Sequence, residues 1–206
     1  MKLNLPNKLT VLRLILVPIF LVVGMLPDSI IPFYISCVVC AVLFIGTALT
    51  DMFDGKIARK RGLITDFGKF LDPVADKFMV IGALFVILYK FEALKTPMIF
   101  TIIIIVFREL AVTSMRLVVS TGKGIVVAAN YLGKLKTVSQ IVFICTVFLE
   151  PVVEYIVELI VGGAANNIVH GIYPLTWLSM AFAVVMTVWS GINYIVAYWK
   201  CLDPEK

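Results

Sequence analysis

The segment that decides the fold and the chemistry of this chain runs from residue 51 to residue 76 and reads DMFDGKIARKRGLITDFGKFLDPVAD. It holds five of the 13 acidic residues, between two long apolar runs. At 3.6 residues per helical turn, residues 3, 4, 7 or 8 positions apart share one face. One stripe then carries Asp51, Asp54, Gly55 and Ala58, and a second stripe carries Gly68, Asp72 and Asp76. A turn at Gly62 makes the two helices antiparallel neighbours, so four carboxylates are expected to converge.

The composition places this segment in a membrane protein. Of the 206 residues, 61% are hydrophobic and 15% are charged, and the mean hydropathy is +1.04. Soluble domains have about 45–50% apolar and about 25% charged residues. A core of this size cannot hide so much apolar surface from water. The composition therefore excludes a soluble enzyme, a secreted disulfide scaffold and a disordered chain.

Six runs are long and apolar enough to cross a bilayer, which takes about 20 residues each. They cover approximately Leu9–Leu26, Ile30–Ala58, Gly68–Tyr89, Pro97–Val119, Ala128–Leu149 and Tyr173–Trp199. We therefore expect an all-α integral membrane protein with six transmembrane helices, formed as one domain over residues 1–206. Cys37 and Cys40 are expected to be buried thiols within the second span. Residues 152–161 carry Glu154 and Glu158 one turn apart, which predicts a separate helix lying in the membrane interface.

The positive charges orient the spans. With the amino terminus inside, all Lys and Arg residues except Lys90 and Lys95 fall on the inner side. Cytoplasmic loops of membrane proteins carry such an excess. Both termini and the carboxylates are therefore expected to face the cytoplasm. The net charge of +5 indicates orientation and contact with anionic lipid, and no nucleic-acid partner is expected.

Carboxylates at membrane depth require a physical reason, because ionised groups are costly there. Asp51, Asp54, Asp72 and Asp76 cannot all ionise close together without cations. An all-oxygen set of ligands suits Mg²⁺ or Mn²⁺, and four carboxylates could hold two ions about 3.5–4 Å apart, as in phosphoryl-transfer sites. A solvated loop of ordinary charges is the simpler alternative, but two spaced Asp pairs with glycines in register make it the weaker one.

The spacing of this segment resembles the signature of the CDP-alcohol phosphotransferase family. Its fixed positions are Asp51, Asp54, Gly55, Ala58, Arg59, Gly68, Asp72 and Asp76, and every one is filled. Further stretches resemble the bacterial phosphatidylglycerophosphate synthase branch of that family: Asn7 to Arg13, Pro18, Arg108-Glu109, Thr113 to Arg116 and Gly133 to Thr137. The similarity extends over nearly the whole chain.

The resemblance implies a six-helix fold, usually a homodimer, here in a bacterial cytoplasmic membrane. It implies that a hydroxyl attacks the β-phosphorus of CDP-diacylglycerol, so that CMP leaves. By resemblance, Asp51, Asp54 and Asp72 are metal ligands, and Asp76 is both a ligand and the general base. Arg59, with Gly55, Ala58 and Gly68, is expected to hold the CDP group.

The acceptor must be chosen by residues outside the signature. Arg108 and Arg116 lie eight residues apart in the fourth span, and Lys134 and Lys136 open the fifth. These four cations are expected to hold a second phosphate. An acceptor with its own phosphate, such as glycerol 3-phosphate, would fit this site, and its product would be phosphatidylglycerophosphate. Cations near a membrane also snorkel to lipid headgroups. Arg13 could face either the site or the headgroups.

Two other functions stay open at this stage. A sibling enzyme could use inositol phosphate, phosphatidylglycerol (making cardiolipin) or serine as acceptor. A divalent-metal transporter is the remote alternative, but transporters have broken helices in related halves. This chain shows no internal repeat, and its acids lie toward one face of the membrane.

Overall fold

The structure of the chain is a computed structural model that describes residues 4–61, 66–123, 131–161 and 173–199. Side chains are described for the same residues except 5–6, 52–61, 66–67, 69, 119–123 and 161. The predicted Asp54, Gly55, Ala58 and Arg59 therefore lie on a helical backbone, but their side chains are outside the described residues.

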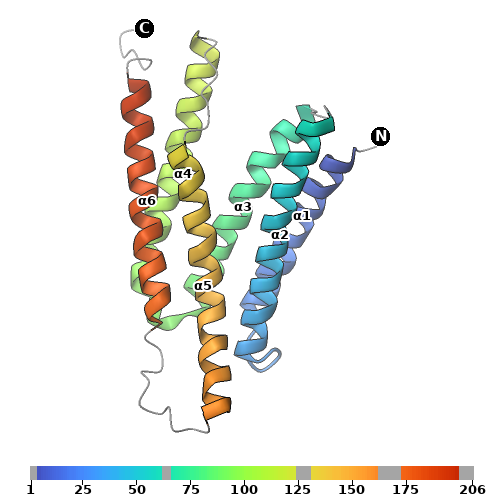
Figure 1. The fold of residues 1–206 in the computed structure, drawn as a ribbon, viewed down its shortest axis with the longest axis vertical. Helices are drawn as coiled ribbons and strands as arrows, with labels where there is room; N and C mark the ends of the chain where they lie inside the picture. Colours follow the sequence, from blue (N-terminus) through green and yellow to red (C-terminus); the bar gives the residue numbers. More distant parts are fainter. Residues whose placement is uncertain (1–3, 62–65, 124–130, 162–172, 200–206) are drawn as a thin grey trace.

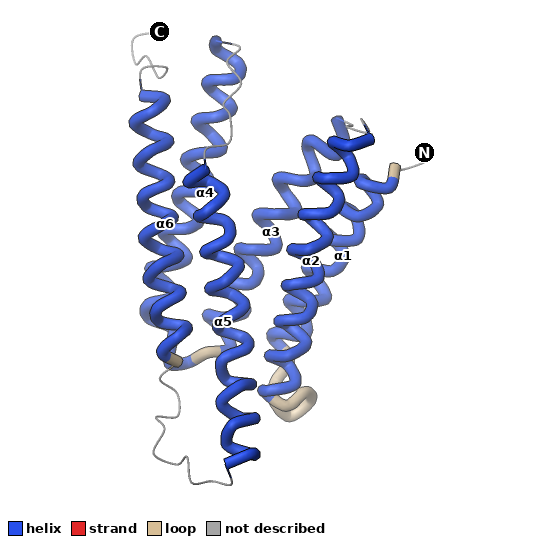
Figure 2. The backbone as a smooth tube through the Cα atoms, in the orientation of Figure 1, coloured by secondary structure: helices blue, strands red, loops and turns tan. Residues whose placement is uncertain are grey.

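The described residues form helices and no strands, which confirms the all-α prediction (Figure 2). The α-helices are α1 (Leu5–Met25), α2 (Phe33–Arg61), α3 (Asp66–Lys90), α4 (Lys95–Lys123), α5 (Tyr131–Val161) and α6 (Pro174–Tyr198). A short 3₁₀ helix, η1 (Glu92–Leu94), joins α3 to α4.

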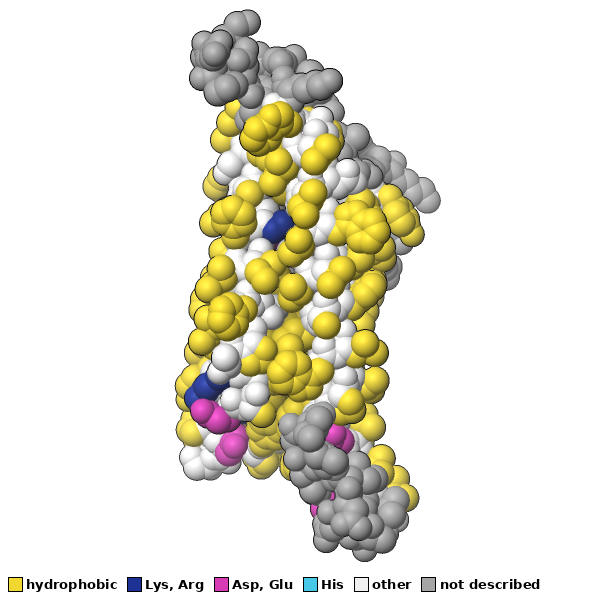
Figure 3. All heavy atoms as spheres, turned by 90° about the vertical axis from the view of Figure 1, so that its left-hand side faces the viewer, with side chains coloured by type: hydrophobic (Ala, Val, Ile, Leu, Met, Phe, Trp, Pro, Cys, Tyr) yellow, Lys and Arg dark blue, Asp and Glu magenta, His cyan; other side chains and the backbone are white. Residues whose placement is uncertain are grey.

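Among these helices, α1, α2, α4, α5 and α6 are long and apolar enough to cross a membrane. Helix α3 is also long, but it is not among these five, and it carries Asp72, Asp76, Lys77 and Lys90 along its length. The described part of the chain is thus an all-α membrane protein, and the sixth span stays a prediction. Figure 3 shows one face, over α4 and α6, on whose middle hydrophobic side chains predominate around a single visible Lys or Arg side chain.

Figure 1 shows α1, α2 and α3 on one side of the molecule, α4 and α6 on the other, and α5 between them. Small residues bring α1 and α3 into close contact, as is common where membrane helices cross. A Cβ on Gly24 of α1 would lie 2.4 Å from a methyl group of Val86, and one on Gly82 of α3 would lie 3.1 Å from Leu21. Helix α1 packs more extensively against α2 and α3 than these two pack against each other.

Aromatic side chains fill the core between α1, α2 and α5. Phe20 contacts the ring of Phe148 edge-on, with ring centroids 5.9 Å apart, and also packs against Phe44. Cys37 and Cys40 are fully buried in the same core, which confirms the prediction for these thiols. This core packs α2 directly against both α1 and α5.

The prediction of a separate interfacial helix at residues 152–161 is wrong. Helix α5 continues through Pro151 to Val161 without a break. Proline lacks the backbone N–H that would donate a helical hydrogen bond, and it usually kinks or ends a helix. Contacts with neighbouring helices can nevertheless stabilise a helix that continues beyond a proline. Here Tyr155 stacks on Tyr34 of α2 at 4.2 Å, and Glu150 accepts hydrogen bonds from the first turn of α6. Contacts on both sides of Pro151 therefore hold the segment in line with α5.

Candidate active site

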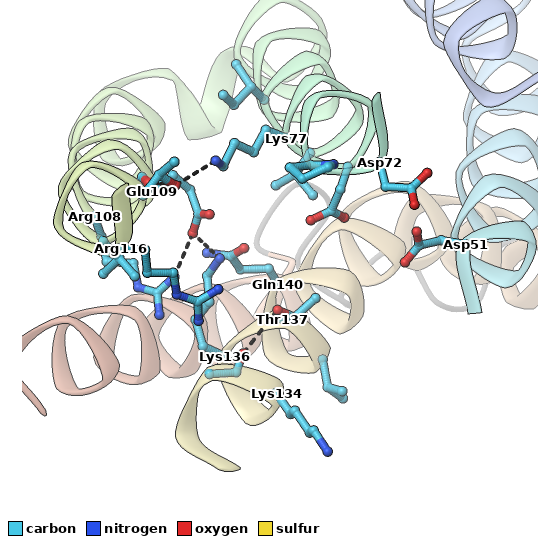
Figure 4. A pocket seen from close by; sticks show the side chains of 18 of the residues that line it. Asp51, Asp72, Lys77, Arg108, Glu109, Arg116, Lys134, Lys136, Thr137 and Gln140 are labelled. Atoms are coloured by element: carbon cyan, nitrogen blue, oxygen red, sulfur yellow. Dashed lines mark hydrogen bonds and ion pairs between the residues drawn. The ribbon is translucent and has the colours of Figure 1, made fainter. Parts of the chain in front are cut away.

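A cavity of about 590 Å³ opens among α2, α3, α4, α5 and α6 (Figure 4). Its lining includes Tyr194, near the end of α6, and Figure 1 shows that α6 ends at the same end of the bundle at which α1 begins. Its charged lining residues are Asp51, Asp72, Asp76, Lys77, Arg108, Glu109, Arg116, Lys134 and Lys136. Figure 4 shows Asp51 and Asp72 on one side and Arg108, Arg116 and Lys136 on the other. The cavity thus has two walls of opposite charge.

The carboxylate wall consists of Asp51 from α2 and of Asp72 and Asp76 from α3. Asp72 and Asp76 are one helical turn apart, so α3 presents both to the same space, as the spacing predicts. Asp51 and Asp76 are exposed and Asp72 is half-buried, which leaves all three accessible to a ligand. Gly68 is buried and does not line the cavity.

Helix α1 supplies a hydrogen-bond donor to each of two carboxylates. The guanidinium of Arg13 is wholly buried and donates from Nη1 to Oδ1 of Asp51 at 2.6 Å. The hydroxyl of Thr10 donates to Oδ1 of Asp72 at 2.7 Å. Arg13 therefore faces the site and not the lipid headgroups. Thr10 has no charge or spacing that would have pointed to this role.

The oxygen donors of the carboxylate wall fit a hard divalent cation by their chemistry. Within the described side chains, however, no three Asp, Glu, His or Cys residues lie close enough to hold an ion as one group. Asp51 and Asp72 are instead engaged by Arg13 and Thr10. The fourth predicted ligand, Asp54, lies outside the described side chains.

The cation wall consists of Arg108 and Arg116 from α4 and of Lys134 and Lys136 from α5. The structure thus brings together in one cavity the four cations that were predicted to form an acceptor site. Lys136 is buried, whereas Arg116 and Lys134 are exposed. Lys134 lies at the edge in Figure 4, away from Arg108 and Lys136.

Glu109 is the residue that the sequence reasoning missed on this wall. Its Oε1 accepts hydrogen bonds from Nη1 of Arg108 at 3.0 Å and from the ammonium of Lys136. A buried cation is stable only if it is paired, so Glu109 explains how Lys136 can be buried here. Its signal was present in the sequence, because Glu109 is the acid that the predicted fourth span, Pro97–Val119, carries.

Three further polar contacts complete the lining, and none of them has a sequence signal. Lys77 donates to the hydroxyl of Thr113 at 2.6 Å, and the amide of Gln140 donates to Thr187 at 3.0 Å. Tyr194 of α6 accepts a hydrogen bond from Arg116. Each contact joins two helices, so only their packing reveals it.

Comparison of the sequence with known proteins places the chain in a family. The profile of the CDP-alcohol phosphatidyltransferase family matches residues 3–189. The chain belongs to the CDP-alcohol phosphatidyltransferase family. Three similar bacterial proteins carry the name CDP-diacylglycerol–glycerol-3-phosphate 3-phosphatidyltransferase. The protein from Bacillus subtilis is 39% identical and covers 98% of each chain. That from Yersinia enterocolitica is 33% identical, over 99% of this chain and all of its own, and that from Wigglesworthia glossinidia is 34% identical, over 98% of each.

Membership of the CDP-alcohol phosphatidyltransferase family confirms the resemblance drawn from residues 51–76. The family match includes every residue that lines the cavity except Tyr194. The end of α6, from Ser190 to Tyr198, lies beyond the matched residues.

Proposed function

We propose that this protein transfers the phosphatidyl group of CDP-diacylglycerol to sn-glycerol 3-phosphate, giving phosphatidylglycerophosphate and CMP. The observation that carries the proposal is one cavity with a carboxylate wall facing a cation wall. The names and full-length similarity of the relatives support the same reaction. The donor brings a diphosphate and the acceptor a second phosphate, and each needs its own countercharges.

The carboxylate wall is the donor side. Asp51, Asp54, Asp72 and Asp76 would hold two divalent ions, Mg²⁺ or Mn²⁺. Such ions, when bound, neutralise negative charge on a diphosphate and on the departing phosphate. Gly55, Ala58, Arg59 and Gly68 would hold the CDP group. These assignments follow the family signature, and the exposed carboxylates of Asp51 and Asp76 are in keeping with it.

Asp76 is the proposed general base. The C1 hydroxyl of glycerol 3-phosphate forms a new P–O bond at the β-phosphorus, the bond between that phosphorus and CMP breaks, and the hydroxyl proton passes to the Asp76 carboxylate. Asp76 lines the cavity as part of the carboxylate wall and is exposed there. Asp76 would contribute to catalysis mainly by its position next to the hydroxyl, because a carboxylate among cations is a weak base.

The cation wall is the acceptor side. Arg108, Arg116, Lys134 and Lys136 would bind the phosphate that the product retains. Planar guanidinium groups match phosphate oxygens with paired hydrogen bonds. Glu109 leaves the wall with a net positive charge while it holds Arg108 and Lys136 in place.

The protein would act in the bacterial cytoplasmic membrane, with this cavity open to the cytoplasm and with a second copy as its partner. The positive charges of the sequence support this orientation. The broad apolar outer surface supports the lipid environment.

The deciding experiment incubates the purified protein with CDP-diacylglycerol, Mg²⁺ or Mn²⁺, and one acceptor at a time. The acceptors are glycerol 3-phosphate, inositol phosphate, phosphatidylglycerol and serine, and mass spectrometry identifies the lipid product. We expect phosphatidylglycerophosphate and one CMP per product. A product from another acceptor alone, with none from glycerol 3-phosphate, would overturn the proposal.

A further inference from the structure

One turn near the carboxyl end of α6 contacts both arginines of the cation wall. The contacting residues are Ser190, Gly191 and Tyr194, which we call the α6 cradle. We propose that the α6 cradle positions Arg108 and Arg116 for the acceptor phosphate and so helps to determine acceptor affinity. The proposal rests on the function proposed above, because it takes the cation wall as the acceptor site.

The first contact fixes the guanidinium of Arg108. Its Nη2 donates to the hydroxyl of Ser190 at 2.7 Å, while its Nη1 donates to Glu109 at 3.0 Å. Ser190 is fully buried, and a buried hydroxyl is stable when it is hydrogen-bonded. Two acceptors on different helices, α4 and α6, therefore hold the plane of this guanidinium.

The second contact explains a glycine in the interior of α6. A Cβ on Gly191 would lie 3.2 Å from Cγ of Arg108. Glycine is a poor helix former, so its presence here calls for a packing reason. The aliphatic part of Arg108 lies against the α6 backbone at this point, and a larger residue would push it away.

The third contact holds Arg116. The Tyr194 hydroxyl accepts a hydrogen bond from Nη2 of Arg116, and the Tyr194 ring centroid lies 5.1 Å from Cζ of Arg116. The same ring lies 5.8 Å from Cζ of Arg108. Tyr194 is buried, and Tyr198 stacks on it at 5.9 Å. A fixed ring thus anchors two guanidinium groups, including that of the exposed Arg116, which would otherwise have rotational freedom.

The position of the cradle gives it a separate role from the donor site. The α6 cradle contacts the cation wall, and the family match ends at residue 189, just before it. We infer that changes in the cradle alter the acceptor's KM while the donor's KM stays the same. Ser190, Gly191 and Tyr194 are positioning residues, since they act through Arg108 and Arg116.

The test is steady-state kinetics of the purified full-length protein, varying each substrate while the other is saturating. The variants are Tyr194→Phe, Ser190→Ala and Gly191→Ala. Each should raise the KM for glycerol 3-phosphate by about three- to tenfold, the effect of losing one ordinary hydrogen bond or contact, because these residues act on the phosphate only through the arginines. The KM for CDP-diacylglycerol should stay unchanged, and thermal unfolding should show that each variant is still folded. Ser190→Thr, which keeps a hydroxyl, should restore much of the acceptor affinity.

A double-mutant cycle tests whether Tyr194 acts through Arg116. The double variant Tyr194→Phe/Arg116→Gln should be little worse than Arg116→Gln alone. Matched controls are Tyr198→Phe, which alters the neighbouring tyrosine outside the cavity, and Gly46→Ala in α2, where a Cβ would meet nothing within 4 Å. Both controls should behave as the unaltered protein does.

The outcomes separate the two proposals. Failure of the unaltered protein to use glycerol 3-phosphate would overturn the proposed function, and the same comparison would then be run with whichever acceptor it does use. The proposal for the α6 cradle is overturned if that acceptor lacks a phosphate. It is also overturned if the variants change the KM of both substrates equally, or the KM of neither. A third contrary result would be that the separate effects of Tyr194→Phe and Arg116→Gln multiply in the double variant.

Discussion

At the residue scale, the charges of the cavity are held in pairs that cross between helices. Arg13 of α1 engages Asp51 of α2, and Lys136 of α5 engages Glu109 of α4. Unpaired ionised groups would be costly at membrane depth. Pairing therefore lets the protein keep opposite charges in one cavity without losing its apolar surroundings.

The residue that is proposed to accept the proton can be tested alone. Asp76→Asn keeps the shape of the side chain but removes its basicity. We expect turnover, measured as CMP release, to fall by a factor on the order of 10²–10⁴, the usual contribution of a general base. CDP-diacylglycerol binding, measured in parallel, should largely survive because other carboxylates remain. Asp28→Asn, at the opposite end of the bundle beside Lys90, is the control. Near-normal turnover in Asp76→Asn would remove Asp76 from this role.

At the scale of the elements, α1 takes part in the site although its residues do not line the cavity. Thr10 and Arg13 lie one turn apart and reach α3 and α2 respectively. Helix α1 therefore orients the carboxylates of the carboxylate wall from outside the cavity. It also packs against both α2 and α3, the helices that carry this wall.

Removing the Thr10 hydroxyl should leave the Asp72 carboxylate less firmly oriented. Thr10→Val keeps the side-chain volume but loses the 2.7 Å hydrogen bond to the carboxylate. Loss of a group that orients a metal ligand typically lowers metal affinity roughly 10- to 100-fold. We expect the Mg²⁺ or Mn²⁺ concentration for half-maximal activity to rise to a similar extent. Thr146→Val is the matched control, because its hydroxyl bonds only to a carbonyl of its own helix. Identical metal titrations for Thr10→Val and the unaltered protein would contradict this role.

A second element-scale prediction concerns the junction of α5 and α6. The buried Glu150 carboxylate accepts hydrogen bonds from the backbone N–H groups of Leu175 and Thr176, at 2.8 and 2.7 Å. Negative charge is favourable at a helix amino terminus. Glu150→Gln leaves one acceptor oxygen and no charge, so the free energy of unfolding should fall by about 1–3 kcal/mol. Thermal unfolding in detergent should show a lower melting temperature.

The control for this change is Glu92→Gln, which breaks only an exposed ion pair with Lys95. Exposed ion pairs contribute little to stability. Equal melting temperatures for Glu150→Gln and Glu92→Gln would mean that Glu150 does not secure α6.

At the scale of the whole molecule, the two walls come from two sides of the bundle. The carboxylate wall belongs to α2 and α3, which α1 joins, and the cation wall belongs to α4 and α5, with α6 behind it (Figure 1). Helix α5 contacts both α2 and α6, so it joins the two sides. The distance between donor and acceptor therefore depends on how the whole bundle packs.

The orientation of the whole molecule in the membrane can be tested at one thiol. Cys201 follows α6 in the sequence, so the proposed topology places it on the cytoplasmic side. In a variant that keeps only Cys201, an impermeant thiol reagent should fail to label intact cells and should label inverted vesicles. Labelling of intact cells would reverse the orientation and put the cavity on the wrong side for cytoplasmic substrates.

The sequence by itself determined the all-α membrane character, most helix limits to within a few residues, and most of the charged groups that line one cavity, though not Lys77 or Glu109. These features depend on composition, hydropathy and helical periodicity, which are local properties of the chain. The continuation of α5 past Pro151 could not be predicted, because its support comes from Tyr34 of α2 and from the start of α6.

Only the tertiary structure decided which partners the charges have. Arg13 and Asp51 are 38 positions apart, Thr10 and Asp72 are 62 apart, and Arg108 and Ser190 are 82 apart. No periodicity within one helix relates residues so distant in sequence. Their pairing depends on which helices pack together and at what rotation, and both are set by core contacts such as Phe20 with Phe148 and Gly24 with Val86.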